Sequence, residues 1–141
     1  MSLVPPTIEA YQVQHLPIVK AYADKIGVVE VINQIVPTET AIDAGTMVLG
    51  LILDTLSGRS PLYRLQEFFA HQDTALLLGK TVAPEAFHDD TVERVLDRLY
   101  DTGTMKVFTA CHRRGRGSQH LEGGRRSRLH EADHAPSRYF L

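Results

Sequence analysis

Apolar residues recur every three or four positions along most of the first 110 residues, which is the spacing of amphipathic α-helices. Between His15 and Val36 the pattern predicts two short helices, and Gly27 between them can adopt the left-handed conformation that ends a helix. Pro37 is expected to end the second helix, because the residue before a proline is disfavoured in the helical region.

The segment 47–56 is apolar on almost every side, which is typical of a helix at the centre of a domain. A strand is the alternative, but the length of the run favours a helix. Asp43 is the expected N-cap and Gly58 the expected C-terminal stop. The run is shorter than the ~18 residues of a membrane-spanning candidate, and no other apolar run reaches that length, so we expect no membrane partner.

Two more helices are predicted between Pro61 and Gly79. Pro61 suits the first turn of a helix, and residues 74–78 form a short apolar helix that Gly79 closes. The apolar face of the first helix is expected to consist of Leu62, Leu65, Phe68 and Phe69.

A further helix is predicted to begin at Asp90, because the string Asp90-Thr-Val-Glu93 has the form of a capping box. It should end at Gly103, and Met105, Val107 and Phe108 begin another apolar element. No segment alternates with period two, so we predict an all-α fold, a compact bundle of about five to six short helices. The expected buried stripe of the helix is Val92, Val95, Leu96, Leu99 and Tyr100.

The charge changes sign at about Cys111. Residues 1–110 have a net charge of −6, whereas residues 111–141 have a net charge of +4 and few apolar groups. Such a composition cannot bury enough surface to offset chain entropy, so we expect a disordered basic tail. The predicted organisation is an N-terminal extension at 1–11, a helical domain at 12–110 and this tail.

The arginines of the tail could neutralise DNA phosphates without reading a base sequence. The alternative, which we favour, is that they have no selected role. The lone Cys111 has no partner for a disulfide and is interpreted as an incidental free thiol of a cytoplasmic protein. The candidate non-specific DNA contacts are Arg113, Arg114, Arg116, Arg125, Arg126 and Arg128.

His88, Asp89 and Asp90 are adjacent and could suggest a metal site. Hard cations need several oxygens converging from different directions, so we favour the alternative that an aspartate caps the following helix. We assign no catalytic, metal-binding or cofactor-binding residue, because no nucleophile lies near a base and no phosphate-binding glycine pattern occurs. The charged residues that follow are expected to form ion pairs on a solvent-facing surface: Glu93, Arg94, Asp97, Arg98 and Asp101.

Four strings, at 58–69, 77–79, 87–90 and 94–103, together resemble the N-terminal domain of a group of bacterial insertion-sequence transposases. That domain is itself catalogued as being of unknown function, and the resemblance covers roughly residues 12–110. The residues that match the family pattern, with structural or interaction roles, are Pro61, Leu62, Tyr63, Phe68, Phe69, Gly79, Asp89, Asp90, Leu96, Asp97, Leu99, Tyr100 and Gly103.

The resemblance implies a role in DNA transposition. The full-length family cuts and joins DNA with Mg²⁺ held in a ribonuclease-H-like DDE catalytic domain, while the N-terminal domain helps to hold transposon ends or a second subunit. This sequence departs from the pattern after Ala110 and lacks the Asp-Thr-Thr/Ser context of the first catalytic aspartate. Every basic residue after that point is Arg, so our hypothesis is a truncated transposase, frameshifted after Ala110.

We therefore expect a non-catalytic protein without a cofactor, with DNA as its partner and a possible homo-oligomeric state. Two alternatives stay open. One is a small standalone DNA-binding regulator that uses the arginine-rich tail, although the net charge of −6 over residues 1–110 opposes a broad phosphate-binding face. The other is a dimerisation module, which should expose an apolar surface beyond its core.

Overall fold

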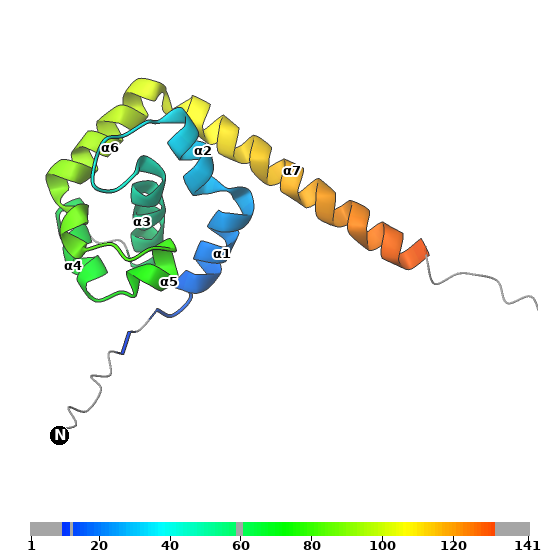
Figure 1. The fold of residues 1–141 in the computed structure, drawn as a ribbon, viewed down its shortest axis with the longest axis horizontal. Helices are drawn as coiled ribbons and strands as arrows, with labels where there is room; N and C mark the ends of the chain where they lie inside the picture. The colour runs from blue at the N-terminus through cyan, green and yellow to red at the C-terminus, as the bar shows by residue number, and fades with distance from the viewer. Residues whose placement is uncertain (1–9, 12, 59–60, 132–141) are drawn as a thin grey trace, which may run out of the picture.

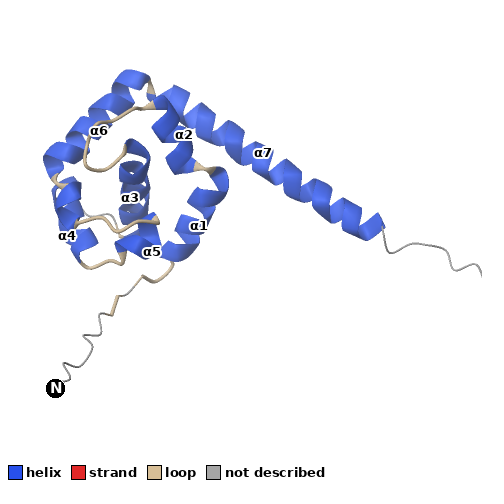
Figure 2. Cartoon of the chain, viewed as in Figure 1, coloured by secondary structure: helices blue, strands red, loops and turns tan. Residues whose placement is uncertain are grey.

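The computed structural model describes residues 10–11, 13–58 and 61–131, with side chains described as far as Gly117. All regular structure in these residues is helical, which confirms the predicted all-α class (Figure 2). The elements are α1 (Leu16–Ile26), α2 (Val28–Ile35), α3 (Ala44–Ser57), the 3₁₀ helix η1 (Leu62–Arg64), α4 (Leu65–Ala70), α5 (Thr74–Leu78), the 3₁₀ helix η2 (Pro84–Phe87), α6 (Asp89–Thr102) and α7 (Thr104–Glu131).

Helix α3 lies at the centre, with the other helices around it (Figure 1). The predicted N-cap is confirmed, because the Asp43 side chain accepts a hydrogen bond of 2.8 Å from the Thr46 N–H, and Gly58 follows the last turn. Helix α3 packs closely against α2, since a Cβ on Gly45 would lie 2.3 Å from the Val29 carbonyl oxygen. The spacing of α2 and α3 therefore depends on a residue without a side chain.

The corner between α1 and α2 is built as predicted. Gly27 has φ +64° and its N–H donates to the last carbonyls of α1, a conformation that glycine adopts without a steric penalty. Helix α2 ends at Ile35, and Val36 caps it directly before Pro37.

The segment after Pro61 differs from the single predicted helix. It divides into η1 and α4, and Leu62, in the 3₁₀ turn, is 50% exposed, so its place in the predicted core face is wrong. Leu65 and Phe69 are buried as expected, and the Phe69 ring stacks on the Phe87 ring with centroids 4.0 Å apart. The core contact that organises this segment thus comes from η2, a distant segment.

Helix α6 begins at Asp89 with His88 as its N-cap, two residues before Asp90, so the predicted capping box with Asp90 as the cap is wrong. Its end at Gly103 is confirmed. Val92 and Val95 are buried as predicted. Tyr100 is 78% exposed, so its place in the predicted buried stripe of the helix is wrong. Leu96 and Leu99 lie between these extremes and are only partly buried against the core.

Helix α7 requires the largest correction. The predicted disorder from residue 111 is wrong for residues 111–131, which are helical; residues 132–141 lie outside the described part of the chain, as do residues 1–9 of the N-terminal extension. Val107, Cys111 and Gly115 are four residues apart and therefore share one face of α7, which lies against the body of the domain. A Cβ on Gly115 would lie 3.1 Å from Cγ2 of Ile26, so glycine at this position permits close packing of α7 against α1.

Candidate interaction site beside helix α7

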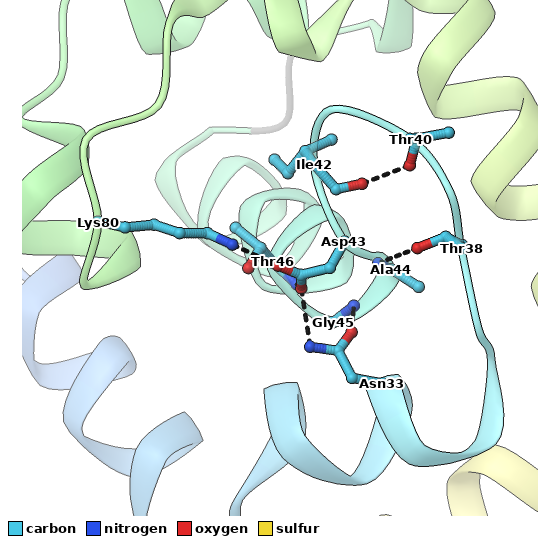
Figure 3. Close-up of polar contacts among 9 residues, drawn as sticks. All are labelled: Asn33, Thr38, Thr40, Ile42, Asp43, Ala44, Gly45, Thr46 and Lys80. Atoms are coloured by element: carbon cyan, nitrogen blue, oxygen red, sulfur yellow. Dashed lines mark hydrogen bonds and ion pairs between the residues drawn. The ribbon is translucent and has the colours of Figure 1, made fainter.

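A polar network joins the end of α2 to the start of α3 (Figure 3). Asn33 Nδ2 donates to Asp43 Oδ1 at 2.9 Å, and Asn33 Oδ1 accepts from the Gly45 N–H at 2.7 Å. Lys80, from the segment after α5, forms an ion pair with Asp43. The network caps α3 and ties three segments together, so we assign it to stability rather than to ligand binding.

The charge of Asp43 depends on these contacts. Partial burial raises the pKa of Asp43, but hydrogen bonds from Lys80, Thr46 and Asn33 together lower it by more. The pKa of Asp43 therefore lies well below its ordinary range, and the carboxylate is ionised at neutral pH.

The candidate metal cluster of His88, Asp89 and Asp90 is exposed at the start of α6. His88 Nδ1 lies 2.7 Å from Asp89 Oδ1 and 3.4 Å from the Asp90 backbone nitrogen. Two lone pairs would repel at the shorter distance, so Nδ1 carries a proton and donates to Asp89. The Asp90 N–H then has Asp89 Oδ1 as its acceptor, at 3.1 Å. The N-cap position is His88, and the two acids of the first turn complement the helix dipole.

The solvent-facing charges of α6 do not pair as expected. Within the described residues, no ion pair within 4.0 Å joins Glu93, Asp97 or Asp101 to Arg94 or Arg98. These side chains are exposed, and their charges remain available to a partner.

The residues that match the family pattern are spread over several parts of the domain. Phe68 and Phe69 belong to the core region, Gly79 and Gly103 end helices, and Pro61 caps η1. Leu62 and Tyr63 are exposed on η1, and Asp89 and Asp90 start α6. The structure brings together one subset beside α7: Leu96, Asp97, Leu99 and Tyr100.

This subset forms one wall of a groove of about 960 Å³ between α6 and α7. The base comes from α1, α2 and α3, whose positions along the sequence gave no indication that they would meet here. Phe108 and Cys111 contribute from α7, and burial raises the pKa of the Cys111 thiol, which keeps it protonated. The lining residues are Ile26, Val28, Ile32, Val48, Ile52, Leu96, Asp97, Leu99, Tyr100, Thr104, Val107, Phe108, Cys111, His112, Gly115 and Arg116.

The candidate DNA-contacting arginines of α7 do not all have the same role. Arg114 lies over Gly27, where a Cβ would be 2.5 Å from its Nε, so the guanidinium sits beside the C-terminal end of α1. The partial negative charge of a helix C-terminus favours a cation there, which gives Arg114 a docking role. Arg113 and Arg116 are exposed. The side chains of Arg125, Arg126 and Arg128 lie outside the described part of the chain, although their backbone is in α7.

Helix α7 and the rest of the domain have opposite charges. Helix α7 contains seven Lys/Arg and two Asp/Glu, a net charge of +5, whereas residues 1–103 contain seven and fourteen, a net charge of −7. The distal part of α7 projects away from the body of the domain (Figure 1). A basic helix is therefore presented beside an acidic body.

These features define an all-α domain with a lateral apolar groove and a projecting basic helix. The family model described as a domain of unknown function (DUF4277) matches residues 8–112, and the chain belongs to this family. The comparisons with curated proteins and with solved structures gave no match. No helix in the described residues combines the length and the apolar character that crossing a membrane requires.

Proposed function

We propose that this domain acts in DNA transposition as a non-catalytic part of an insertion-sequence transposase, where it helps to hold the transposon ends. The observation that carries the proposal is α7, a 28-residue helix of net charge +5 that projects from an acidic body. Arg114 and Gly115 of this helix lie against the end of α1, so the proposal treats the residues after Ala110 as a working part of the domain, in place of the frameshift and the lack of a selected role that the sequence favoured. The resemblance of residues 12–110 to the N-terminal domain of such transposases supplies the biological setting.

The dimensions and charge of α7 suit a duplex. At about 1.5 Å per residue the helix is roughly 40 Å long, and the major groove of DNA admits an α-helix. The body, with its net charge of −7 over residues 1–103, repels phosphates, so contacts are confined to α7. Backbone neutralisation of this kind gives affinity that depends strongly on salt and only weakly on base sequence.

In this proposal, another domain of the transposase carries out the chemistry of transposition. Two-metal cleavage needs carboxylates that converge from separate elements, whereas Asp89 and Asp90 are consecutive and start one helix. The Mg²⁺ of the full-length family therefore has no proposed ligand among the residues described here, and we expect no nicking of DNA by this domain with Mg²⁺ or Mn²⁺.

The test is a salt titration of duplex DNA binding, followed by fluorescence anisotropy. Replacing Arg125, Arg126 and Arg128 by Gln should weaken binding at low salt at least tenfold and reduce the slope of log K against log salt by up to about 2–3. A control variant with Arg94→Gln and Arg98→Gln removes exposed charges from α6 instead and should bind like the wild type. If the wild type fails to bind DNA at low salt, or the control loses as much affinity, the proposal is wrong.

A further inference from the structure

We propose that the groove between α6 and α7 is a homodimer interface, occupied by the same face of a second copy of this chain. The inference does not depend on DNA binding, and it assigns a partner to the part of the family pattern that lies beside α7.

Large apolar side chains are exposed around the groove. Tyr100 on α6 is 78% exposed and Phe108 on α7 is 66% exposed, although both are large and apolar. The floor continues this surface with partly buried aliphatic side chains of α1 and α3, namely Ile26, Val48 and Ile52. Contiguous apolar surface of this kind typically marks an interaction site, and aromatic side chains are enriched in the centres of protein interfaces.

The two sides of the groove carry side chains of opposite charge. Asp97 lines it from α6, and Arg116 lines it from α7. Neither side chain has an ion-pair partner within 4.0 Å among the described residues. The groove thus has one acidic side and one basic side, each with an uncompensated charge.

A second copy of the chain can neutralise the charges on both sides of the groove. In a twofold-symmetric dimer the same patch meets itself in reversed orientation, so the acidic side of one copy faces the basic side of the other. Asp97 of each protomer can then pair with Arg116 of its partner, which gives two equivalent ion pairs around a shared apolar centre. A partner of single charge sign would satisfy only one of the two sides.

The charge distribution of the whole chain favours the same arrangement. Helix α7 has a net charge of +5 and residues 1–103 a net charge of −7, so α7 of one copy is attracted to the body of the other.

The mass of the purified full chain, without DNA, should be measured by sedimentation equilibrium over a wide concentration range. We expect a reversible monomer–dimer equilibrium. Asp97→Arg and Arg116→Asp should each raise the dimer dissociation constant at least tenfold, because like charges then meet across the interface. The double variant should return to within about threefold of the wild type, since the swapped charges are again complementary.

A second pair of variants tests the apolar centre. Phe108→Glu should abolish dimerisation, whereas Tyr63→Glu, at an aromatic residue 68% exposed on η1, should leave it unchanged. Circular dichroism should be measured for each variant as a control that it is folded. A chain that stays monomeric at all concentrations overturns the proposal, as does a double charge-swap variant that dimerises no better than the single variants. Binding of a hydrophobic fluorescent probe to a strictly monomeric chain would instead identify a small-molecule groove. These outcomes do not decide the DNA-binding proposal, because its assay measures the affinity of α7 variants for duplex DNA.

Discussion

Replacing Gly45 by alanine should destabilise the domain, although the higher helix propensity of alanine alone would stabilise it. A Cβ at this position would lie 2.3 Å from the Val29 carbonyl oxygen and 2.7 Å from the Val29 Cα. Both are backbone atoms of α2, so they cannot move aside as a flexible side chain can. An ordinary C···O contact is about 3.3 Å or longer, so α2 and α3 must separate by roughly 1 Å.

Two destabilising effects and one stabilising effect set the size of the change in the free energy of unfolding. Overpacking of a well-packed interior costs about 1–3 kcal/mol, and weakening the hydrogen bond from the Gly45 N–H to Asn33 costs about 0.5–1.5 kcal/mol. The higher helix propensity of alanine returns at most about 1 kcal/mol. Mid-range values of these terms give a net loss of about 2 kcal/mol, which at about 4 °C per kcal/mol lowers Tm by roughly 8 °C.

Thermal and urea melts followed by circular dichroism at 222 nm measure this change. The matched control is Gly117→Ala, since a Cβ on Gly117 meets nothing within 4 Å and the residue lies within α7. That variant should be neutral or more stable by up to about 1 kcal/mol. If Gly45→Ala melts at or above the wild-type temperature, the close approach of α2 and α3 is refuted.

Two other predictions concern the cap of α3 and the docking of α7. Because the pKa of Asp43 is lower in the folded than in the unfolded state, its ionisation stabilises the fold above the unfolded pKa of about 3.9, and this contribution is lost as the pH falls through the lower folded value. Asp43→Asn should thus cost about 1 kcal/mol at pH 7 and progressively less in urea melts between pH 5 and pH 2; a cost independent of pH would contradict the assignment. A chain truncated after Gly117 should melt within about 0.5 kcal/mol of the full chain, whereas truncation after Cys111 removes the contacts with Ile26 and Gly27 and should cost more than 1 kcal/mol. Equal stability of the two truncated chains, compared at a concentration where both are monomeric, would show that α7 does not dock through these contacts.

Local chemistry made much of the fold predictable from the sequence. The left-handed Gly27, the capping Asp43 and the helix ends at Gly79 and Gly103 were all predicted, and all are confirmed. In each case the interaction joins residues a few positions apart, so a short window of sequence contains its cause. The apolar spacing of 47–56 likewise predicted a central helix, because only a buried helix can be apolar on every side.

Burial depended on partners that lie far apart in the sequence. Leu62 and Tyr100 continue an apolar spacing, yet both are exposed, because no distant element covers them. The sequence alone did not show that Phe87 would stack on Phe69, or that five helices would enclose a groove. Spacing identifies which residues share a helix face, but the neighbours of that face are set by how the helices pack.

The segment after Ala110 shows this difference most clearly. Its glycines and low apolar content describe a chain with little local tendency to form a packed helix. In the first turns after Ala110 the tertiary structure supplies what the local sequence lacks: Ile26 accepts the close approach of Gly115, and the end of α1 accepts the charge of Arg114. Helix formation in a weak sequence is decided by such packing, because each docked turn gains contacts that offset the entropy of ordering the chain.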